Sequence, residues 1–255
     1  MSDLLRVDAV SRRFGGLQAL KDVSFSVPAG SATAVIGPNG AGKTTLLDVI
    51  TGFTRPDTGE VMFDGRPITN VRPQELAGHG LMRTFQSARL VPRLTVRENL
   101  MLGAHHLSSA GMWAGGLRLG RSRREERAMR ARAEAALRFL ELSRYADSPA
   151  AGLPAGTQRM IEVGRVLVGS PRLVLLDEPA AGLDDTETLE LADVLRAVRA
   201  ADISMVLIEH NVGLVMTVSD SVLVLDAGAP IAHGTPAEVM ADPAVIAAYL
   251  GEKTA

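Results

Sequence analysis

The sequence contains no cysteine, few aromatic residues and no long apolar run. Without cysteine among its 255 residues, the chain has no disulfides, thiolate metal sites or thiol nucleophiles, a composition that suits a reducing cytosol. No apolar run approaches the roughly 18 residues that a spanning helix needs, so we expect a chain that does not cross a membrane by itself. The first residues lack a basic segment followed by an apolar one, which predicts no secretory signal.

An excess of positive charge is also absent. The formal net charge is −2, which argues against a nucleic-acid partner, because such binding depends on surplus cationic side chains. The 46% apolar and 22% charged residues are typical of a soluble globular protein. The length allows one domain or a domain with a sizeable insertion. We expect an insertion, because residues 87–153 change from strand-like to helical periodicity.

The clearest motif is a glycine-rich loop between a predicted strand and a predicted helix. Residues 32–36 form a short apolar run, and helical spacing of apolar residues resumes at Leu46. Between them the sequence matches G-x-x-x-x-G-K-[ST] in the strand–loop–helix context that the motif requires, with Gly37, Pro38, Asn39, Gly40, Ala41, Gly42, Lys43, Thr44 and Thr45. The alternative is a glycine turn that only caps a helix.

This loop has the chemistry of a triphosphate site. Glycine accepts positive φ, so backbone N–H groups can curl around phosphate oxygens at the positive end of the following helix. Lys43 is then expected to contact the β and γ phosphates, and the Thr44 hydroxyl to be a ligand of Mg²⁺.

Two carboxylates end a second apolar run. Residues 173–176 are apolar on both faces, which predicts a central strand of a parallel sheet ending at Asp177 and Glu178. Ligands gather at the carboxyl ends of such strands. We expect Asp177 to bind the same Mg²⁺ as Thr44, and Glu178 to polarise the attacking water. The alternative is a pair that caps a helix.

Three further side chains are candidates by position. Gln86 ends a predicted strand at 81–86, where its amide can contact Mg²⁺ and orient water; a surface glutamine is the alternative. His210 follows a buried strand and can hydrogen-bond the γ phosphate and sense its loss; alone it would be structural. Phe14 can stack on a base, although a core phenylalanine is the alternative.

The remaining pattern predicts the surrounding elements. Alternation at 5–10 and 23–27 predicts antiparallel strands, a turn is expected over 51–60, and a short strand over 61–63. Thr95 and Glu98 form a capping box at a helix start. An arginine-rich helix follows, whose charges form a solvated face or contact a partner or anionic headgroups. Helices are predicted from 154–167 and 186–200, then a closing hairpin from 222–234 and two short helices.

In their order, these parts resemble the ATP-binding subunits of ABC transporters over essentially the whole chain. The resemblance implies that Phe14 is the adenine platform and that residues 37–45 are the Walker A loop. It implies further that Gln86, residues 153–158, residues 173–178, Asp184 and His210 are the Q-loop, signature, Walker B, D-loop and switch histidine. The bound nucleotide would be ATP with Mg²⁺. Ala155 and Gly156 would contact the ATP of a partner subunit, and Asp184 would lie beside it.

Within that family the chain is most similar to subunits of branched-chain amino acid importers. The similarity lies in residues 83–86, the insertion around 111–127, residues 177–183 and 208–211, and the ending from 234–236 to 249–252. ATPases of urea or amide importers and lipopolysaccharide exporters share much of this pattern. The resemblance implies a subunit that hydrolyses ATP to drive import of branched-chain or other hydrophobic amino acids.

The implied fold is α/β: a P-loop NTPase core of the ABC ATPase type with an antiparallel β subdomain and an inserted α-helical subdomain. We expect a single domain over 1–255, in which 1–86 and 158–255 form the core with its β subdomain and 87–157 the helical subdomain. The implied partners are two transmembrane permease subunits and a second ATPase subunit, identical or related, paired head to tail. A periplasmic or extracellular substrate-binding protein would act indirectly, and the chain would lie peripherally on the cytoplasmic face of the inner membrane.

The signature departs from the family pattern. The family usually has Leu-Ser-Gly-Gly-Gln, whereas this chain has Leu153-Pro154-Ala155-Gly156-Thr157 followed by Gln158. The serine hydroxyl that would reach the partner's γ phosphate is therefore missing. Proline is accepted at the first position of a helix, so N–H groups from Ala155 onward can still face the phosphate. One lost hydrogen bond to a charged group costs about 1.5–3 kcal/mol, which predicts slower hydrolysis in the partner's site.

Two readings of other classes remain open at this point. A soluble ABC-type ATPase acting on ribosomes or DNA is disfavoured, because translation-factor types carry two cores and repair types a long coiled coil. This chain has one loop of the 37–45 kind and an insertion of under seventy residues. A weakly catalytic, regulatory nucleotide-binding subunit is the other alternative, and Pro154 is the feature that favours it.

Overall fold

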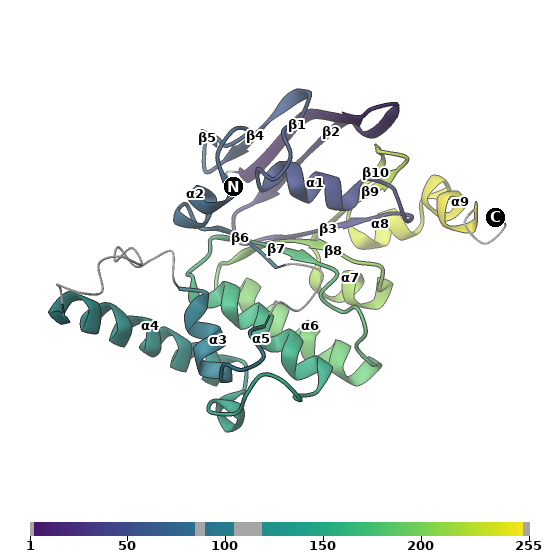
Figure 1. Ribbon diagram of the computed structural model, residues 1–255. Coiled ribbons are helices and arrows are strands. Elements are labelled where there is room, and N and C mark those ends of the chain that lie inside the picture. The colour runs from purple at the N-terminus through teal and green to yellow at the C-terminus, as the bar shows by residue number, and fades with distance from the viewer. Residues whose placement is uncertain (1–2, 85–89, 105–118, 252–255) are drawn as a thin grey trace.

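The protein is described by a computed structural model over residues 3–84, 90–104 and 119–251 (Figure 1). A six-stranded sheet forms its centre in the order β10-β9-β3-β8-β7-β6. Its strands are β3 (Ala32–Ile36), β6 (Leu81–Arg83), β7 (Leu173–Asp177), β8 (Ser204–Ile208), β9 (Ser221–Asp226) and β10 (Ala229–Gly234). β9 and β10 pair antiparallel as the predicted hairpin, and the other neighbours pair parallel.

Three central strands are buried at every position, which explains their unbroken apolar runs. β3, β7 and β8 have no exposed residue, because helices or a second sheet cover both faces of the large sheet. The predicted strand at 32–36 is confirmed, and the strand predicted to end at Asp177 and Glu178 and the buried strand ahead of His210 are each confirmed within one residue.

A second, antiparallel sheet lies across α1 (Lys43–Ile50) from the first (Figure 1). Its strands are β1 (Asp3–Phe14), β2 (Leu17–Pro28), β4 (Thr58–Phe63) and β5 (Arg66–Pro67), in the order β2-β1-β4-β5. The predicted antiparallel pairing is confirmed, with Leu5 opposite Val27. Apolar side chains of both sheets and of α1 form one continuous core, so the loop before α1 is held from two sides.

The prediction of a turn up to residue 60 is wrong at its end. β4 already begins at Thr58, and Glu60 pairs with Asp8 of β1. A Cβ at Gly59 would lie 2.4 Å from the carbonyl oxygen of Asp8. The glycine therefore marks a close approach of two strands rather than a free turn.

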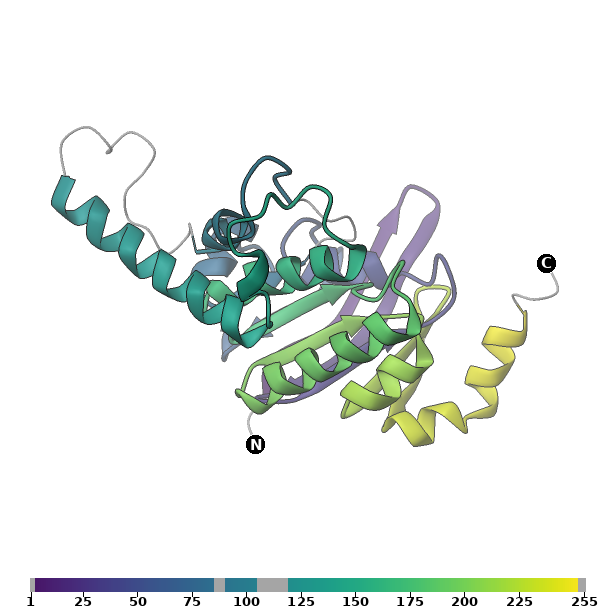
Figure 2. The same ribbon diagram turned by 90° about the horizontal axis from the view of Figure 1, so that it is seen from below.

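Helices cover the opposite face of the large sheet (Figures 1 and 2). α3 (Val96–Leu102), α4 (Leu119–Phe139) and α5 (Ala155–Val168) pack on one another, with a 3₁₀ turn at Ser143–Tyr145 between α4 and α5. α6 (Asp185–Ala200) contacts α5 and α7 (Val212–Val218). The other helices are α2 (Pro73–Gly78), α8 (Pro236–Met240) and α9 (Pro243–Gly251). None of the helices in the described ranges is long and apolar enough to span a bilayer.

The capping box predicted at Thr95 and Glu98 is confirmed, as are the helices at 154–167 and 186–200 within one residue and the two short terminal helices. The helices α2 and α7 and the short strand β5 were not predicted. The expected boundary between residues 157 and 158 falls within the first turn of α5. The division of the chain into core and helical subdomain stays a prediction.

Gly103 sets the distance between α3 and α5. A Cβ at this position would lie 1.8 Å from the Arg165 carbonyl oxygen, whereas one at Gly78, the last residue of α2, would meet nothing within 4 Å. Gly103→Ala must therefore push backbone apart, and we expect it to lower the free energy of unfolding by about 2–3 kcal/mol. Gly78→Ala is the matched control and should be neutral or slightly stabilising. Urea unfolding of both variants measures the difference, and equal stabilities would contradict this packing.

Candidate active site

The loop between β3 and α1 has backbone angles that glycine accepts best. Gly37 and Gly42 have φ values of 147° and 98°. A Cβ would lie 2.0 Å from the Leu225 carbonyl oxygen at Gly37, and 2.4 Å from that of Ala19 at Gly42. Gly42 is the N-cap of α1, which has neither a side-chain cap nor an acidic residue in its first turn. The loop therefore presents a helix N-terminus that no carboxylate of that turn neutralises.

Lys43 lies inside this loop. Its side chain is buried, and Nζ donates to the carbonyl oxygens of Gly37 at 2.7 Å and Pro38 at 2.8 Å. Both acceptors belong to the loop itself, so the Lys43 ammonium group links two of the loop's backbone carbonyl groups. The same ammonium group supplies positive charge beside the glycine N–H groups.

A pocket of about 410 Å³ opens at this loop. It brings together residues from β1, β2, the loop, the start of α1 and the end of β7: Phe14, Leu17, Gln18, Ala19, Asn39, Gly40, Ala41, Gly42, Lys43, Thr44, Thr45 and Glu178. Phe14 is 46% exposed and is therefore not a core residue. The Arg12 guanidinium lies 4.6 Å from the centre of its ring, and Asp57 in turn pairs with Arg12 at 2.7 Å. The Phe14 ring is thus packed against a cation on one face.

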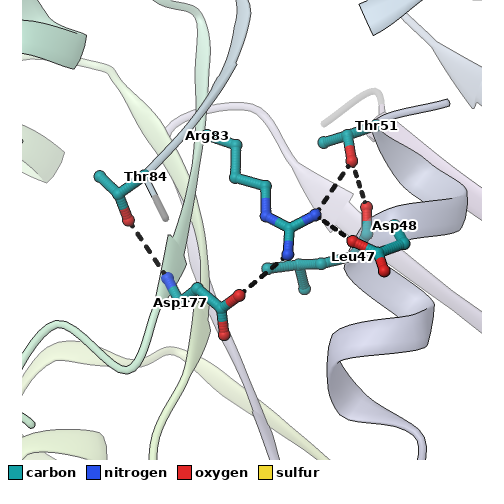
Figure 3. A network of polar contacts seen from close by, with 6 residues as sticks. All are labelled: Leu47, Asp48, Thr51, Arg83, Thr84 and Asp177. Atoms are coloured by element: carbon teal, nitrogen blue, oxygen red, sulfur yellow. Dashed lines mark hydrogen bonds and ion pairs between the residues drawn. The ribbon is translucent and has the colours of Figure 1, made fainter. Parts of the chain in front are cut away.

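Asp177 ends β7 and is buried beside Arg83 (Figure 3). Arg83 donates to Asp177 Oδ2 at 2.9 Å and, through its other terminal nitrogen, to Asp48 Oδ1 of α1 at 2.5 Å. The backbone N–H of Asp177 donates to the Thr84 hydroxyl at 3.3 Å. One arginine therefore bridges two carboxylates from elements that are far apart in the chain.

The second oxygen of Asp177 fits a metal ion. Among the described residues, Oδ1 is buried and has no hydrogen-bond partner. A buried carboxylate oxygen is costly without a donor or a cation, and oxygen ligands are those that Mg²⁺ prefers. Within the same residues no group of three or more His, Cys, Asp or Glu side chains could hold a metal alone.

Glu178 and His210 meet at the pocket edge. His210 Nε2 lies 3.2 Å from Glu178 Oε1. Glu178 has φ of +47°, in the left-handed region that few side chains adopt. Lys43, the Asp177–Glu178 pair and His210 follow β3, β7 and β8, so parallel pairing brings the four predicted side chains to one end of the sheet. Gln86 lies outside the described residues.

Ala155, Gly156 and Asp184 form a second cluster that does not line this pocket. The sequence predicted Pro154 as the first helical residue, whereas α5 begins at Ala155 and Pro154 is its N-cap, without a side-chain cap hydrogen bond. Glu187 supplies an acceptor from α6: Oε1 accepts from the Gly156 N–H at 3.0 Å, and Oε2 from the Asp184 N–H at 3.2 Å. The start of α5 and the start of α6 are therefore joined by one carboxylate.

Sequence reasoning missed four charged side chains that organise the site. Arg83, Glu187 and Glu209 each form a hydrogen bond with a candidate residue or with a loop that carries one, and Asp48 pairs with Arg83. A signal was present for two of them. Arg83 interrupts an apolar strand, and Glu209 directly precedes His210 at the end of a buried strand. Charged residues in such places need partners.

Comparison with known proteins places the chain among ATP-binding subunits. A family model described as ABC transporter matches residues 20–181, and one described as branched-chain amino acid ATP-binding cassette transporter matches residues 229–255. The chain is 39% identical over 250 residues to the high-affinity branched-chain amino acid transport ATP-binding protein BraF of Pseudomonas aeruginosa, and 38% identical over 250 residues to LivG of Escherichia coli. Each match covers 98% of both chains.

Solved structures agree with this result. The ADP conformation of an ATP-binding cassette of an ABC transporter superposes with a TM-score of 0.86 at 34% identity, covering 98% of this chain and 100% of that one. A nucleotide-free ATP-binding cassette gives a TM-score of 0.85 at 33% identity, covering 97% and 99%. The likeness extends over nearly the whole chain.

Glu187 is expected to stabilise α5 from outside. Glu187→Ala removes the acceptor of the Gly156 and Asp184 N–H groups and half of the capping box of α6, so we expect the free energy of unfolding to fall by about 1–2 kcal/mol. Glu190→Ala, at an exposed position of the same helix, is the matched control and should change it by less than about 0.5 kcal/mol. Thermal and urea unfolding measure both, and equal effects would contradict the capping role.

Proposed function

Because this chain belongs to the ABC transporter family, as one of its ATP-hydrolysing subunits, we propose that it drives an importer of branched-chain or other hydrophobic amino acids. The observation that carries the proposal is the pocket at the sheet edge, where the glycine loop, Lys43 and Glu178 surround one space. The substrate class rests on the relatives named for branched-chain amino acid transport and on the matching segment 229–255.

ATP binds, in this proposal, with its phosphates in the loop from Gly37 to Thr45 and its base on Phe14. Backbone N–H groups of the loop donate to the β and γ phosphates, and Lys43 leaves its two loop carbonyls to contact the same oxygens. A base stacked on an aromatic ring contributes about 1–3 kcal/mol. Arg12, packed on the Phe14 ring and paired with Asp57, keeps that ring in place.

Mg²⁺ is the metal that these residues fit. Thr44 would supply a hydroxyl, Asp177 its Oδ1 and Gln86 its amide oxygen. When bound, the ion neutralises charge on the β and γ phosphates. Arg83 holds Oδ2 of Asp177, so the carboxylate keeps its orientation and offers its other oxygen to the site.

Glu178 is the proposed general base. It accepts a proton from the attacking water while the water oxygen bonds to the γ phosphorus and the bond to the ADP oxygen breaks. His210 is within hydrogen-bond distance of Glu178, and we propose that it also contacts the γ phosphate. After phosphate leaves, His210 loses this contact, and in this way the side chain senses whether the γ phosphate is present.

An apolar groove beside Arg83 supports the proposed coupling between ATP hydrolysis and a permease subunit. It measures about 320 Å³ and lies where α2 and β6 face α3 and α5, lined by Thr51, Phe53, Pro73, Leu76, Ala77, Leu81, Met82, Arg83, Thr84, Gly103, Glu162, Arg165 and Val166. Arg83 lines the groove and also holds Asp177. A segment of a transmembrane permease subunit seated there would therefore contact the side chain that positions the proposed metal ligand.

The full assembly in this proposal has two permease subunits and a second ATPase subunit. Head-to-tail pairing would place Ala155, Gly156 and Asp184 of one subunit over the ATP of the other, which accounts for their separation from this chain's own pocket. A periplasmic or extracellular substrate-binding protein would act through the permease. We place the chain peripherally on the cytoplasmic face of the inner membrane, without a nucleic-acid partner.

Glu178→Gln tests the proposed base and the assembly together. General-base catalysis contributes about 10²–10⁴-fold, so the variant should bind ATP as tightly as the parent chain and hydrolyse it at least about a hundredfold more slowly. Exposed Glu190→Gln is the control and should keep normal turnover. Brisk hydrolysis by Glu178→Gln would overturn the assignment of the base.

The same variant identifies the partners. Tagged Glu178→Gln, extracted from membranes with ATP present, should retain two permease subunits and a second ATPase subunit. Permeases of a urea or amide importer, or of a lipopolysaccharide exporter, would replace the amino-acid assignment. Recovery with ribosomes or DNA would favour a soluble ATPase, and full assembly with negligible hydrolysis by the parent chain would favour a regulatory subunit.

Pro154→Ser tests the altered signature. Pro154 has φ of −52° and ψ of 151°, an extended N-cap geometry that serine accepts. The added hydroxyl restores one hydrogen bond to the partner's γ phosphate, so we expect ATPase turnover of the assembled transporter to rise by about tenfold. Pro154→Ala, which removes the ring without adding a hydroxyl, is the matched control. Unchanged or lower turnover in Pro154→Ser would refute this role for position 154.

A further inference from the structure

Glu209 is a buried carboxylate at the end of β8. Only 3% of the residue is exposed, and its oxygens accept three backbone N–H groups: Oε1 from Ala180 at 2.7 Å, and Oε2 from His210 at 3.0 Å and Asn211 at 3.1 Å. No described cationic side chain forms an ion pair with it. Backbone N–H groups therefore stabilise the negative charge of Glu209, as they do where a carboxylate organises a loop.

The three donors belong to the two loops that carry the proposed catalytic pair. Ala180 lies two residues after Glu178 in the loop that follows β7, and His210 directly follows Glu209 at the end of β8. These strands are parallel neighbours, with Asp177 opposite Ile208. One side chain thus ties the position of the Glu178 loop to that of the His210 loop.

The backbone of Glu178 needs such support. Its φ of +47° is strained for a side chain with a Cβ, and such conformations persist where the surroundings hold them. The Glu178 N–H donates to the Ile208 carbonyl oxygen at 3.0 Å, which fixes the residue on its N-terminal side. The Ala180–Glu209 hydrogen bond fixes the segment on its C-terminal side. Both restraints come from the end of β8.

We propose that Glu209 is a positioning residue that holds Glu178 and His210 at their mutual distance of 3.2 Å. The proposal rests on the roles proposed above for those two residues. Glu209 is buried and both of its oxygens accept backbone N–H groups, so it acts through its neighbours. It should therefore affect the chemical step far more than the binding of ATP.

Glutamine cannot replace this carboxylate. One oxygen of Glu209 serves the first loop and the other serves the second. In Glu209→Gln an amide NH₂ replaces one of them and faces backbone N–H donors, so one of the two loops loses its acceptor. Aspartate keeps both oxygens but is one methylene shorter, and it should fail to reach both loops at once.

The test is a comparison of kcat and KM for ATP in the assembled complex. Glu209→Gln removes one hydrogen bond between a charged group and a loop that carries a proposed catalytic residue. We therefore expect its kcat to be about ten- to a hundredfold lower, with KM little changed. The matched control is Glu238→Gln, because Glu238 also accepts a backbone N–H, at Thr235, on an exposed helix start remote in sequence. Its kcat should stay within about twofold of the parent value. A normal kcat in Glu209→Gln, or a loss confined to KM, would overturn the proposal.

A double variant separates positioning from general destabilisation. If Glu209 acts through Glu178, then adding Glu209→Gln to Glu178→Gln should lower kcat no further, because the base is already absent. Multiplicative losses would contradict the proposal. If Glu209→Gln does not fold, Glu209→Asp takes its place, and the same loss in kcat is expected; a normal kcat in that variant would equally overturn the assignment.

Hydrogen exchange distinguishes failure of this inference from failure of the proposed base. In the Glu178→Gln background, replacing Glu209 should speed amide exchange at Ala180, His210 and Asn211, because these N–H groups lose their acceptor. Slow exchange at these amides would show that Glu209 does not restrain the two loops. Fast exchange would show that it does. If Glu178→Gln alone also hydrolyses ATP briskly, then Glu178 is not the base and the effect of Glu209 on catalysis is refuted as well.

Discussion

Parallel pairing of β3, β8 and β7 is the constraint on which the candidate site depends. Each of these strands is buried on both faces, and the polar residues of the candidate site lie where the strands end. Because the strands run in one direction, their carboxyl ends meet at one edge. The glycine loop with Lys43, the Asp177–Glu178 pair and the Glu209–His210 pair follow there, although more than 160 residues separate the first from the last.

Charge at this edge is balanced by a few shared side chains. Arg83 serves both Asp48 and Asp177 and is almost fully buried. Removing it would leave the buried Asp177 carboxylate without its cation, and breaking such a buried pair costs about 3–5 kcal/mol. Glu209 is satisfied by backbone N–H groups instead. The two arrangements have different consequences: Arg83 connects Asp177 to an open groove, whereas Glu209 connects the loops that follow β7 and β8 to each other.

The cluster at the start of α5 is physically separate and serves a different purpose. Pro154 cannot cap a helix with its side chain, and Glu187 of α6 does so from outside. The carboxylate also closes the capping box of α6 with Asp184. One side chain thus links the starts of the two helices. Nucleotide held by a second subunit would meet both segments as one unit.

Local patterns in the sequence determined much of this protein. Unbroken apolar runs located β3 to the residue and β7 and β8 within one residue, and the Thr95–Glu98 capping box marked the start of α3. The loop motif predicts a triphosphate site, because that chemistry resides in contiguous glycines, a lysine and a threonine. Family resemblance then supplied the family, which the comparisons confirm.

Only the tertiary structure decided how distant charges share partners. Arg83 and Asp177 are 94 positions apart, Gly156 and Glu187 are 31 apart, and Ala180 and Glu209 are 29 apart. No periodicity links such pairs, because each depends on how strands and helices are placed after folding. The same reason explains why Thr58 was assigned to a turn, since its strand exists only through pairing with β1. A residue's secondary structure and motif are local properties, whereas its hydrogen-bond partner is a property of the whole fold.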